Sequence, residues 1–258
     1  MSLLSLRGLT RRYAGLVAVD AVDLDLEAGG VHALIGPNGA GKTTLFNLVS
    51  GLVQPSAGRV LLAGQDITRL PPDRRAAAGI ARTFQNIRLF AEMSVAENAM
   101  TGLHVRARAS LPEIVARLPR YRREEAAARS ATAAALDLVG LSDQARRPAA
   151  SLSYGDQRRL EIARAVVAGP RLLLLDEPAA GMNPTETRAL AALVRRIAAM
   201  GTTVLLVEHD MGFVMGLADT ATVLSFGRKL FHGSPQAARR DRGVIEAYLG
   251  HRLAARLA

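Results

Sequence analysis

The feature that most constrains this chain is a glycine-rich segment, GPNGAGKT at residues 36–43, which directly follows a short apolar run. It fits the P-loop pattern. Glycines let the backbone turn tightly so that its N–H groups face phosphate oxygens, and the helix that follows adds positive partial charge. We predict that Lys42 neutralises β- and γ-phosphates and that Thr43 offers a hydroxyl to Mg²⁺. The residues expected around the phosphates are Asn38, Gly39, Ala40, Gly41, Lys42, Thr43 and Thr44.

A second candidate for phosphate chemistry is the apolar run Leu172 to Leu175, which ends in Asp176 and Glu177. In α/β proteins, ligands bind at the carboxyl edge of parallel strands, where both carboxylates would lie. We expect Asp176 to hold the Mg²⁺ shell and Glu177 to accept a proton from the attacking water. Acids after an apolar strand are common, so this prediction depends on the P-loop upstream.

The pattern along the chain predicts an α/β protein with a helical insertion. Strand-like runs occur at residues 22–27, 31–35, 59–62, 80–84, 172–175, 204–207 and 221–226. Between residues 88 and 168 the strand signal disappears, and helices are indicated by the capping-box spacing of Ser94 and Glu97 and by the alanine-rich residues 124–139. We predict one cassette over residues 1–258, with a core lobe (1–87 and 169–258) and a helical subdomain (88–168).

Composition narrows the function classes. The net charge is +10, but Lys42 and Lys229 are the only lysines, and the arginines are scattered rather than gathered in a dense block. This favours a solvated arginine-rich surface over a nucleic-acid site, with contact to acidic lipid headgroups as the alternative. Without cysteine the chain has no disulfides or thiolate metal sites. The apolar runs are too short to cross a bilayer, and no signal segment precedes them, so a cytosolic location is expected.

Residues 152–157, LSYGDQ, precede an arginine-bearing helix expected at residues 158–168. Ser153 is a plausible N-cap, and a helix N-terminus that presents a hydroxyl and a glycine N–H can receive phosphate. The segment resembles the signature loop that separates ABC ATPases from other P-loop enzymes. The resemblance implies that two cassettes pair head-to-tail and that Ser153 and Gly155 face the ATP of the second subunit.

Three further residues lie where the ABC ATPase family has its remaining parts. Gln85 matches the glutamine that senses Mg²⁺ and links the core to the helical lobe, and His209 matches the switch histidine that contacts the γ-phosphate. Tyr13 matches the aromatic residue that stacks on adenine. Each match is weak alone, since a strand-end histidine or an isolated tyrosine is usually structural. The order and spacing of all the motifs carry the resemblance, which covers essentially the whole chain and implies an RecA-like core, an antiparallel β subdomain and an inserted helical subdomain.

The sequence departs from the family pattern at two places. Asn183 stands where the loop after Asp176 and Glu177 normally carries an aspartate, although Asn183, Pro184 and Glu186 also form a sound helix start. Asp156 occupies a place where many signature loops have glutamine, which would put a carboxylate near the sugar of the nucleotide. Both departures bear on the hydrolysis rate.

Three local sequences, at residues 181–184, 207–211 and 226–250, are similar to the branched-chain amino-acid importer ATPases. The resemblance implies an ATP- and Mg²⁺-dependent ATPase, peripheral on the cytoplasmic face of the inner membrane. Its implied partners are integral-membrane permeases, a second ATPase subunit and, indirectly, a periplasmic solute-binding protein. The permease is expected on the helical lobe and the loop after Gln85, near Phe84, Leu89 and Phe90, although core packing explains these apolar residues equally well.

Three alternatives remain for the function. The same local sequences occur in importers of urea and short amides, and a lipopolysaccharide-export ATPase is the nearest transport competitor. An ABC ATPase that acts on nucleic acid or ribosomes would fit the charge, but such proteins generally fuse two cassettes or insert a long coiled coil. This chain has one cassette and no such insertion, so no nucleic-acid partner is expected.

Overall fold

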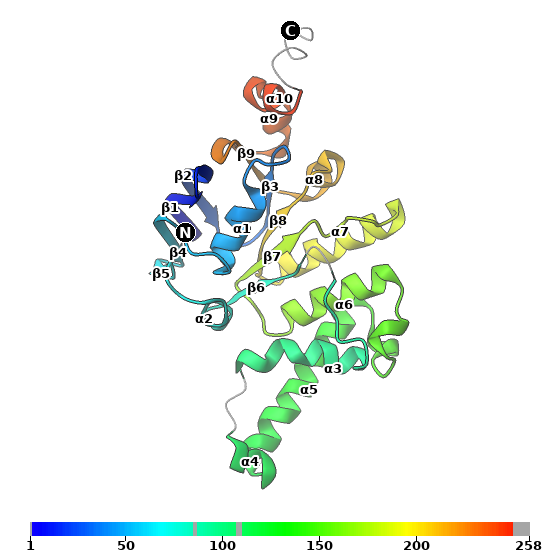
Figure 1. Ribbon diagram of the computed structural model, residues 1–258. Helices are drawn as coiled ribbons and strands as arrows, with labels where there is room; N and C mark the ends of the chain where they lie inside the picture. The colour runs from blue at the N-terminus through cyan, green and yellow to red at the C-terminus, as the bar shows by residue number, and fades with distance from the viewer. Residues whose placement is uncertain (1, 85–86, 107–109, 250–258) are drawn as a thin grey trace. The chain divides into compact units, whose positions relative to one another are not determined.

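The computed structural model describes residues 2–84, 87–106 and 110–249. They form two units, one of residues 1–75 with 174–258 and the other of residues 76–173 (Figure 1). The lobe boundaries expected from the sequence lay at 87/88 and 168/169.

The first unit contains an antiparallel sheet in the order β2-β1-β4-β5. Its strands are β1 (Ser2–Tyr13), β2 (Leu16–Glu27), β4 (Ala57–Leu62) and β5 (Gln65–Asp66). In β2 the leucines and valines from Val22 onward are buried and the acids between them are exposed, as the alternation predicts. The strand predicted at residues 22–27 is therefore confirmed as the second half of β2.

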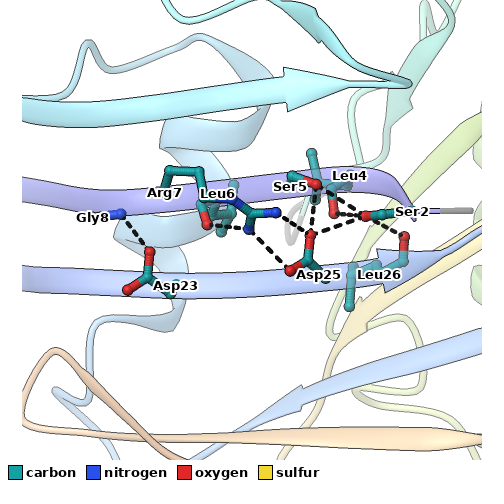
Figure 2. A network of polar contacts seen from close by, with 9 residues as sticks. All are labelled: Ser2, Leu4, Ser5, Leu6, Arg7, Gly8, Asp23, Asp25 and Leu26. Atoms are coloured by element: carbon teal, nitrogen blue, oxygen red, sulfur yellow. Dashed lines mark hydrogen bonds and ion pairs between the residues drawn. The ribbon is translucent and has the colours of Figure 1, made fainter.

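A polar network joins the first two strands (Figure 2). Arg7 donates to both carboxylate oxygens of Asp25, at 3.0 and 2.7 Å, and the Ser5 hydroxyl donates to the same carboxylate at 2.6 Å. The guanidinium and the hydroxyl hold the pKa of Asp25 at about 2. These side chains fix the pairing of β1 with β2 on the exposed face.

The second sheet of this unit has the order β10-β9-β3-β8-β7. Its strands are β3 (Val31–Ile35), β7 (Leu172–Asp176), β8 (Thr203–Val207), β9 (Thr220–Ser225) and β10 (Arg228–Gly233). β3 runs parallel to both β8 and β9, whereas β10 is antiparallel to β9. Every residue of β3, β7 and β8 is buried, which explains their unbroken apolar runs. The predicted strands at 31–35, 172–175, 204–207 and 221–226 are confirmed.

The first unit also contains helices. They are α1 (Lys42–Ser50), α7 (Pro184–Ala199), α8 (Met211–Leu217), α9 (Pro235–Arg240) and α10 (Arg242–Leu249), and α2 (Pro72–Ala77) crosses the boundary between the units. α1 ends at Gly51 in the left-handed conformation, with φ 82°, as expected for a helix stopped by glycine. α7 packs against β3 and β8.

The second unit is mainly helical. Its elements are β6 (Ile80–Arg82), α3 (Val95–Met100), the 3₁₀ turn η1 (Thr101–Arg106), α4 (Leu111–Val115), α5 (Pro119–Val139), η2 (Ser142–Gln144), η3 (Ala149–Ser151) and α6 (Tyr154–Val166). α3, α5 and α6 pack against one another. The capping box of Ser94 and Glu97 is confirmed. β6 lies beside the first residues of β7, and Gly79 O accepts from the N–H groups of Arg171 and Leu172.

Three predicted boundaries in this unit were wrong. The strand predicted at residues 80–84 ends at Arg82. The helix predicted from Glu124 begins at Pro119, because proline is well accommodated in the first turn of a helix. The arginine-bearing helix occupies Tyr154–Val166, since Ser153 caps it four residues earlier than expected.

Candidate active site

The P-loop connects β3 to α1 and has a backbone that glycine makes possible. Gly36, Gly39 and Gly41 have φ values of 149°, 79° and 98°. A Cβ on Gly36 would lie 2.2 Å from the Leu224 carbonyl oxygen, and one on Gly41 would lie 2.3 Å from the Ala18 carbonyl oxygen. Glycine is therefore required at both positions for conformation and for close approach.

Lys42, the first residue of α1, is buried and lies within this loop. Its Nζ donates to the carbonyl oxygens of Gly36 at 2.7 Å and Pro37 at 3.0 Å. Burial lowers the pKa of Lys42, and the negative charge of Glu177 opposes that shift. Asn38, Gly39 and Thr43 are exposed. The loop thus combines an ammonium group with an accessible backbone, as phosphate binding requires.

The two carboxylates at the end of β7 have different environments. Asp176 is 5% exposed, whereas the following residue, Glu177, is partly exposed and has φ 45°. The Glu177 N–H donates to the carbonyl oxygen of Val207 at 3.0 Å. This bond places Glu177 beside the end of β8 in a left-handed conformation that non-glycine residues adopt infrequently.

His209 follows the end of β8, and its Nδ1 lies 3.9 Å from Glu177 Oε1. The fold thus gathers the P-loop lysine, the second carboxylate and the histidine at the carboxyl ends of β3, β7 and β8. This is the edge of the sheet at which ligands of α/β proteins bind. All three of these predicted site residues lie in the first unit.

Tyr13 is the last residue of β1, and its side chain is 40% exposed. The guanidinium carbon of Arg11 lies 4.5 Å from the centroid of the Tyr13 ring, a cation–π distance. Arg11 in turn donates to the Gln54 carbonyl oxygen at 2.8 Å. Arg11 therefore fixes the ring of Tyr13, and sequence reasoning did not predict this contact.

Ser153 and Gly155 lie at the start of α6 in the second unit. The Ser153 hydroxyl accepts from the Asp156 N–H at 3.2 Å, so Ser153 is the N-cap that its sequence position suggested. Asp156 forms an ion pair with Arg159, one helical turn onward. The charge of Asp156 is thus balanced within its own helix.

Gln85 lies outside the described residues, but the structure shows how the preceding residue is held. The Phe84 N–H donates to Glu161 Oε1 at 3.1 Å, and the Phe84 carbonyl accepts from Arg158 Nη1 at 2.8 Å. Arg158 and Glu161 form an ion pair of 2.7 Å with side chains 0% and 1% exposed. Burial raises the pKa of Glu161, and the Phe84 N–H and Arg158 oppose that shift. The two residues of this ion pair therefore hydrogen-bond to both the N–H and the carbonyl of Phe84.

The loop after Glu177 leads into α7. Asn183 caps α7 by accepting from the N–H groups of Thr185 and Glu186 at 2.9 and 3.0 Å, and Glu186 accepts from the Asn183 N–H at 2.9 Å. The predicted helix start at Asn183 is confirmed, which accounts for an asparagine at this position.

Two residues near the site had no role in the sequence-based prediction. Glu208, next to His209, is 1% exposed. Tyr248 of α10 hydrogen-bonds with the backbone of Gly36, and burial raises the pKa of its phenol group. A charged residue at the end of an apolar strand was the available signal for Glu208, whereas nothing in the sequence linked Tyr248 to the P-loop.

Residues 19–180 match the family model for the ABC transporter. The chain belongs to the ABC transporter ATP-binding family. Residues 228–254 match a second model, described as branched-chain amino acid ATP-binding cassette transporter.

Relatives agree with this assignment over nearly the whole chain. The chain is 45% identical to the high-affinity branched-chain amino acid transport ATP-binding protein LivG of Escherichia coli (strain K12) and to its counterpart BraF of Pseudomonas aeruginosa. Each alignment covers 96% of this chain and 98% of the relative. Among solved structures, the ADP conformation of MJ1267, an ATP-binding cassette of an ABC transporter, matches with a TM-score of 0.84 and 29% identity over 97% of this chain and 100% of that one.

Membership of the ABC family establishes an α/β ATP-binding cassette that is an ATPase coupled to transport. The expected fold class and enzyme class are confirmed. In residues 2–84, 87–106 and 110–249, no helix has the length and apolarity needed to span a membrane.

Proposed function

We propose that this chain is the ATP-hydrolysing subunit of a membrane importer for branched-chain or related amino acids. The observation that carries the proposal is the match of residues 228–254 to the branched-chain model, together with 45% identity to LivG over 96% of the chain. The cassette itself does not need to touch the transported solute, so the choice of substrate rests on these likenesses.

The P-loop is proposed to hold the triphosphate of ATP. Lys42 would exchange its contacts with the Gly36 and Pro37 carbonyls for oxygens of the β- and γ-phosphates. The Thr43 hydroxyl and the Asp176 carboxylate are hard oxygen donors of the kind Mg²⁺ prefers, and Gln85 would add a third. When bound, Mg²⁺ neutralises charge that develops on the phosphate oxygens.

Glu177 is proposed as the general base. Its carboxylate would take a proton from water while the water oxygen bonds to the γ-phosphorus and the bond from that phosphorus to the β,γ-bridging oxygen of ADP breaks. His209, 3.9 Å from Glu177, would donate to the γ-phosphate. The left-handed backbone of Glu177 is consistent with this role, because strained conformations gather at active sites.

Tyr13 is proposed to stack on adenine with the ring face that Arg11 leaves accessible. The guanidinium lies 4.5 Å from the ring centroid and so occupies one face. Stacking hardly distinguishes base edges, so Tyr13 would bind adenine and guanine alike.

A second ATPase subunit, identical or homologous, is proposed to complete the site. Ser153 and Gly155 of that subunit would cover the γ-phosphate, since they present a hydroxyl and an amide at a helix N-terminus. Blocked hydrolysis should then trap a closed dimer. Light scattering of the Glu177→Gln protein with MgATP, alone and with its partner ATPase, tests this. Dimers that persist when Ser153 is changed to Arg would contradict a shared site.

A membrane permease is proposed to bind the second unit. That unit has a pocket of about 860 Å³ lined by β6, Phe84, Arg88, Phe90, η1 and the end of α6. The Phe90 side chain is 54% exposed, and the pocket mixes apolar and basic groups. Such a surface fits a short partner helix with apolar and acidic side chains. It would place the chain on the cytoplasmic face of the inner membrane, with a periplasmic solute-binding protein reached through the permease.

The experiment is uptake of radiolabelled leucine, isoleucine, valine or urea by cells that lack the native gene and carry this chain with its permeases. We expect uptake of the branched-chain amino acids, and Phe90→Asp should abolish it while ATP binding remains. Met200→Asp, at an exposed apolar residue of the other unit, is the matched control and should leave uptake unchanged. Uptake of urea alone would overturn the substrate assignment.

A further inference from the structure

Glu208 is a buried carboxylate that the proposed chemistry does not use. It follows the last residue of β8 and is 1% exposed. Burial raises the pKa of Glu208, and neighbouring backbone N–H groups oppose that shift. An acid buried in this way destabilises a fold unless its oxygens accept hydrogen bonds, so the partners of those oxygens indicate what Glu208 does.

The two oxygens of Glu208 bind two different segments. Oε1 accepts from the N–H of Ala179 at 3.1 Å, and Oε2 accepts from the N–H of His209 at 3.3 Å. Ala179 belongs to the loop that follows Glu177, whereas His209 begins the segment after β8. One carboxylate therefore links the loop of the second acid to the histidine segment.

This link lies next to a constrained backbone. Glu177 has φ 45°, and its carbonyl oxygen accepts from the Ala180 N–H at 3.2 Å, which closes a turn around Ala179. The Glu177 N–H is bonded to Val207, the residue before Glu208. The left-handed conformation of Glu177 is thus fixed by its own hydrogen bond to β8. It is also fixed by the hydrogen bond that Ala179, two residues later, donates to the Glu208 carboxylate.

We propose that Glu208 is a positioning residue, which holds the turn after Glu177 and the backbone of His209 in one rigid arrangement so that both side chains keep their place toward the γ-phosphate. This inference rests on the proposed function, in which Glu177 is the base. A side chain with a single acceptor oxygen would satisfy only one of the two segments. The carboxylate explains why an acid, rather than a hydroxyl residue, occupies this buried position.

The first test measures hydrogen–deuterium exchange of the Ala179 and His209 amides in the nucleotide-free, full-length protein. Glu208→Ala removes both acceptors, so both amides should exchange faster than in the wild type. Glu208→Gln keeps one carbonyl oxygen, so one of the two amides should remain protected from exchange while the other loses its protection. Asp219→Asn is the matched control, since Asp219 accepts from the Val31 N–H at 2.8 Å at the opposite end of β3, and it should leave both amides unchanged.

The second test measures hydrolysis and ATP affinity of the same variants. Because misplacement by about 1 Å can cost up to about 10²-fold, we expect kcat to fall by up to that factor while the Kd for ATP stays constant. A residue that only supports the fold would instead lower the melting temperature without this separation of kcat from affinity.

Unchanged exchange at Ala179 in both variants would overturn the proposal, and so would faster exchange with an unaltered kcat. If Glu208→Ala does not fold, the Gln variant decides. Failure of the proposed function would give a different result. Glu177→Gln would then hydrolyse ATP at the normal rate, regardless of the exchange rates of the Ala179 and His209 amides.

Discussion

Removing one partner of the buried ion pair in the second unit should be strongly destabilising. Arg158 and Glu161 lie 2.7 Å apart at 0% and 1% exposure, and together they satisfy the N–H and the carbonyl of Phe84. Glu161→Ala leaves the Arg158 guanidinium without its carboxylate and the Phe84 N–H without its acceptor. Both groups would remain in a site from which water is excluded.

The expected magnitude follows from that burial. Breaking a buried pair by removing one partner costs about 3–5 kcal/mol. For chains of this size a loss of 1 kcal/mol lowers the melting temperature by roughly 2–4 °C, so Glu161→Ala should lower it by roughly 6–20 °C. The exposed pair of Arg129 and Glu125 on α5, 2.6 Å apart, is the matched control, because solvent screens it. Glu125→Ala should therefore shift the melting temperature far less.

Circular dichroism of thermal and urea unfolding measures both variants. The double change Arg158→Met with Glu161→Met leaves no unpaired charge and fills the same space. It should therefore cost less than Glu161→Ala alone, and its remaining cost reflects the Phe84 N–H and carbonyl, which both lose their partners. A loss for Glu161→Ala no larger than that for Glu125→Ala would contradict this prediction. It would mean that the pair is not desolvated in solution.

Three further predictions concern the first unit. Lys42→Ala removes the ammonium group proposed to lie opposite the β- and γ-phosphates, so it should abolish tight ATP binding measured by calorimetry. Unchanged ATP affinity at physiological salt would contradict the P-loop assignment. Tyr13→Ala should weaken ATP and GTP binding together by about 1–3 kcal/mol, and loss of only one nucleotide would count against stacking. Arg7 holds the pKa of Asp25 at about 2, below its ordinary value of 3.8. Between pH 3.8 and about 2 the unfolded chain therefore binds more protons than the folded chain, so stability is lost as the pH falls through this range. Asp25→Asn should make the urea midpoint depend less on pH in the same range.

The positions of the candidate phosphate-site residues could be predicted from local patterns, because the P-loop and the strand-end acids each occupy a short stretch. β3 and β7 are continuous apolar runs, and the residues directly after them supply Lys42 and Glu177. The position of His209 beside Glu177 depends on the order of the strands in the sheet, which no local pattern records.

Irregular elements were harder to predict. β1 was missed because its buried residues do not alternate strictly: the pairing with β2 shifts register between Leu6 and Leu9, where Gly8 has φ 55°. The strand predicted to reach Phe84 stops at Arg82 because side chains from α6 take both polar groups of the Phe84 backbone.

Glu208 illustrates what a sequence cannot supply. Its role depends on burial and on a contact with Ala179, 29 residues earlier in the chain. No local pattern records either property, whereas the capping boxes at Ser94 and Asn183 were predictable because their hydrogen bonds join residues three apart.

The most direct test of the account is single-turnover hydrolysis of ATP by the Glu177→Gln protein, measured beside the wild type and, where the working pair is heteromeric, with the partner ATPase. Glutamine keeps the shape and hydrogen-bonding reach of Glu177 but cannot accept the proton. The chemical step should therefore slow by about 10²–10⁴-fold while ATP affinity is retained. Hydrolysis at the wild-type rate would show that Glu177 is not the base.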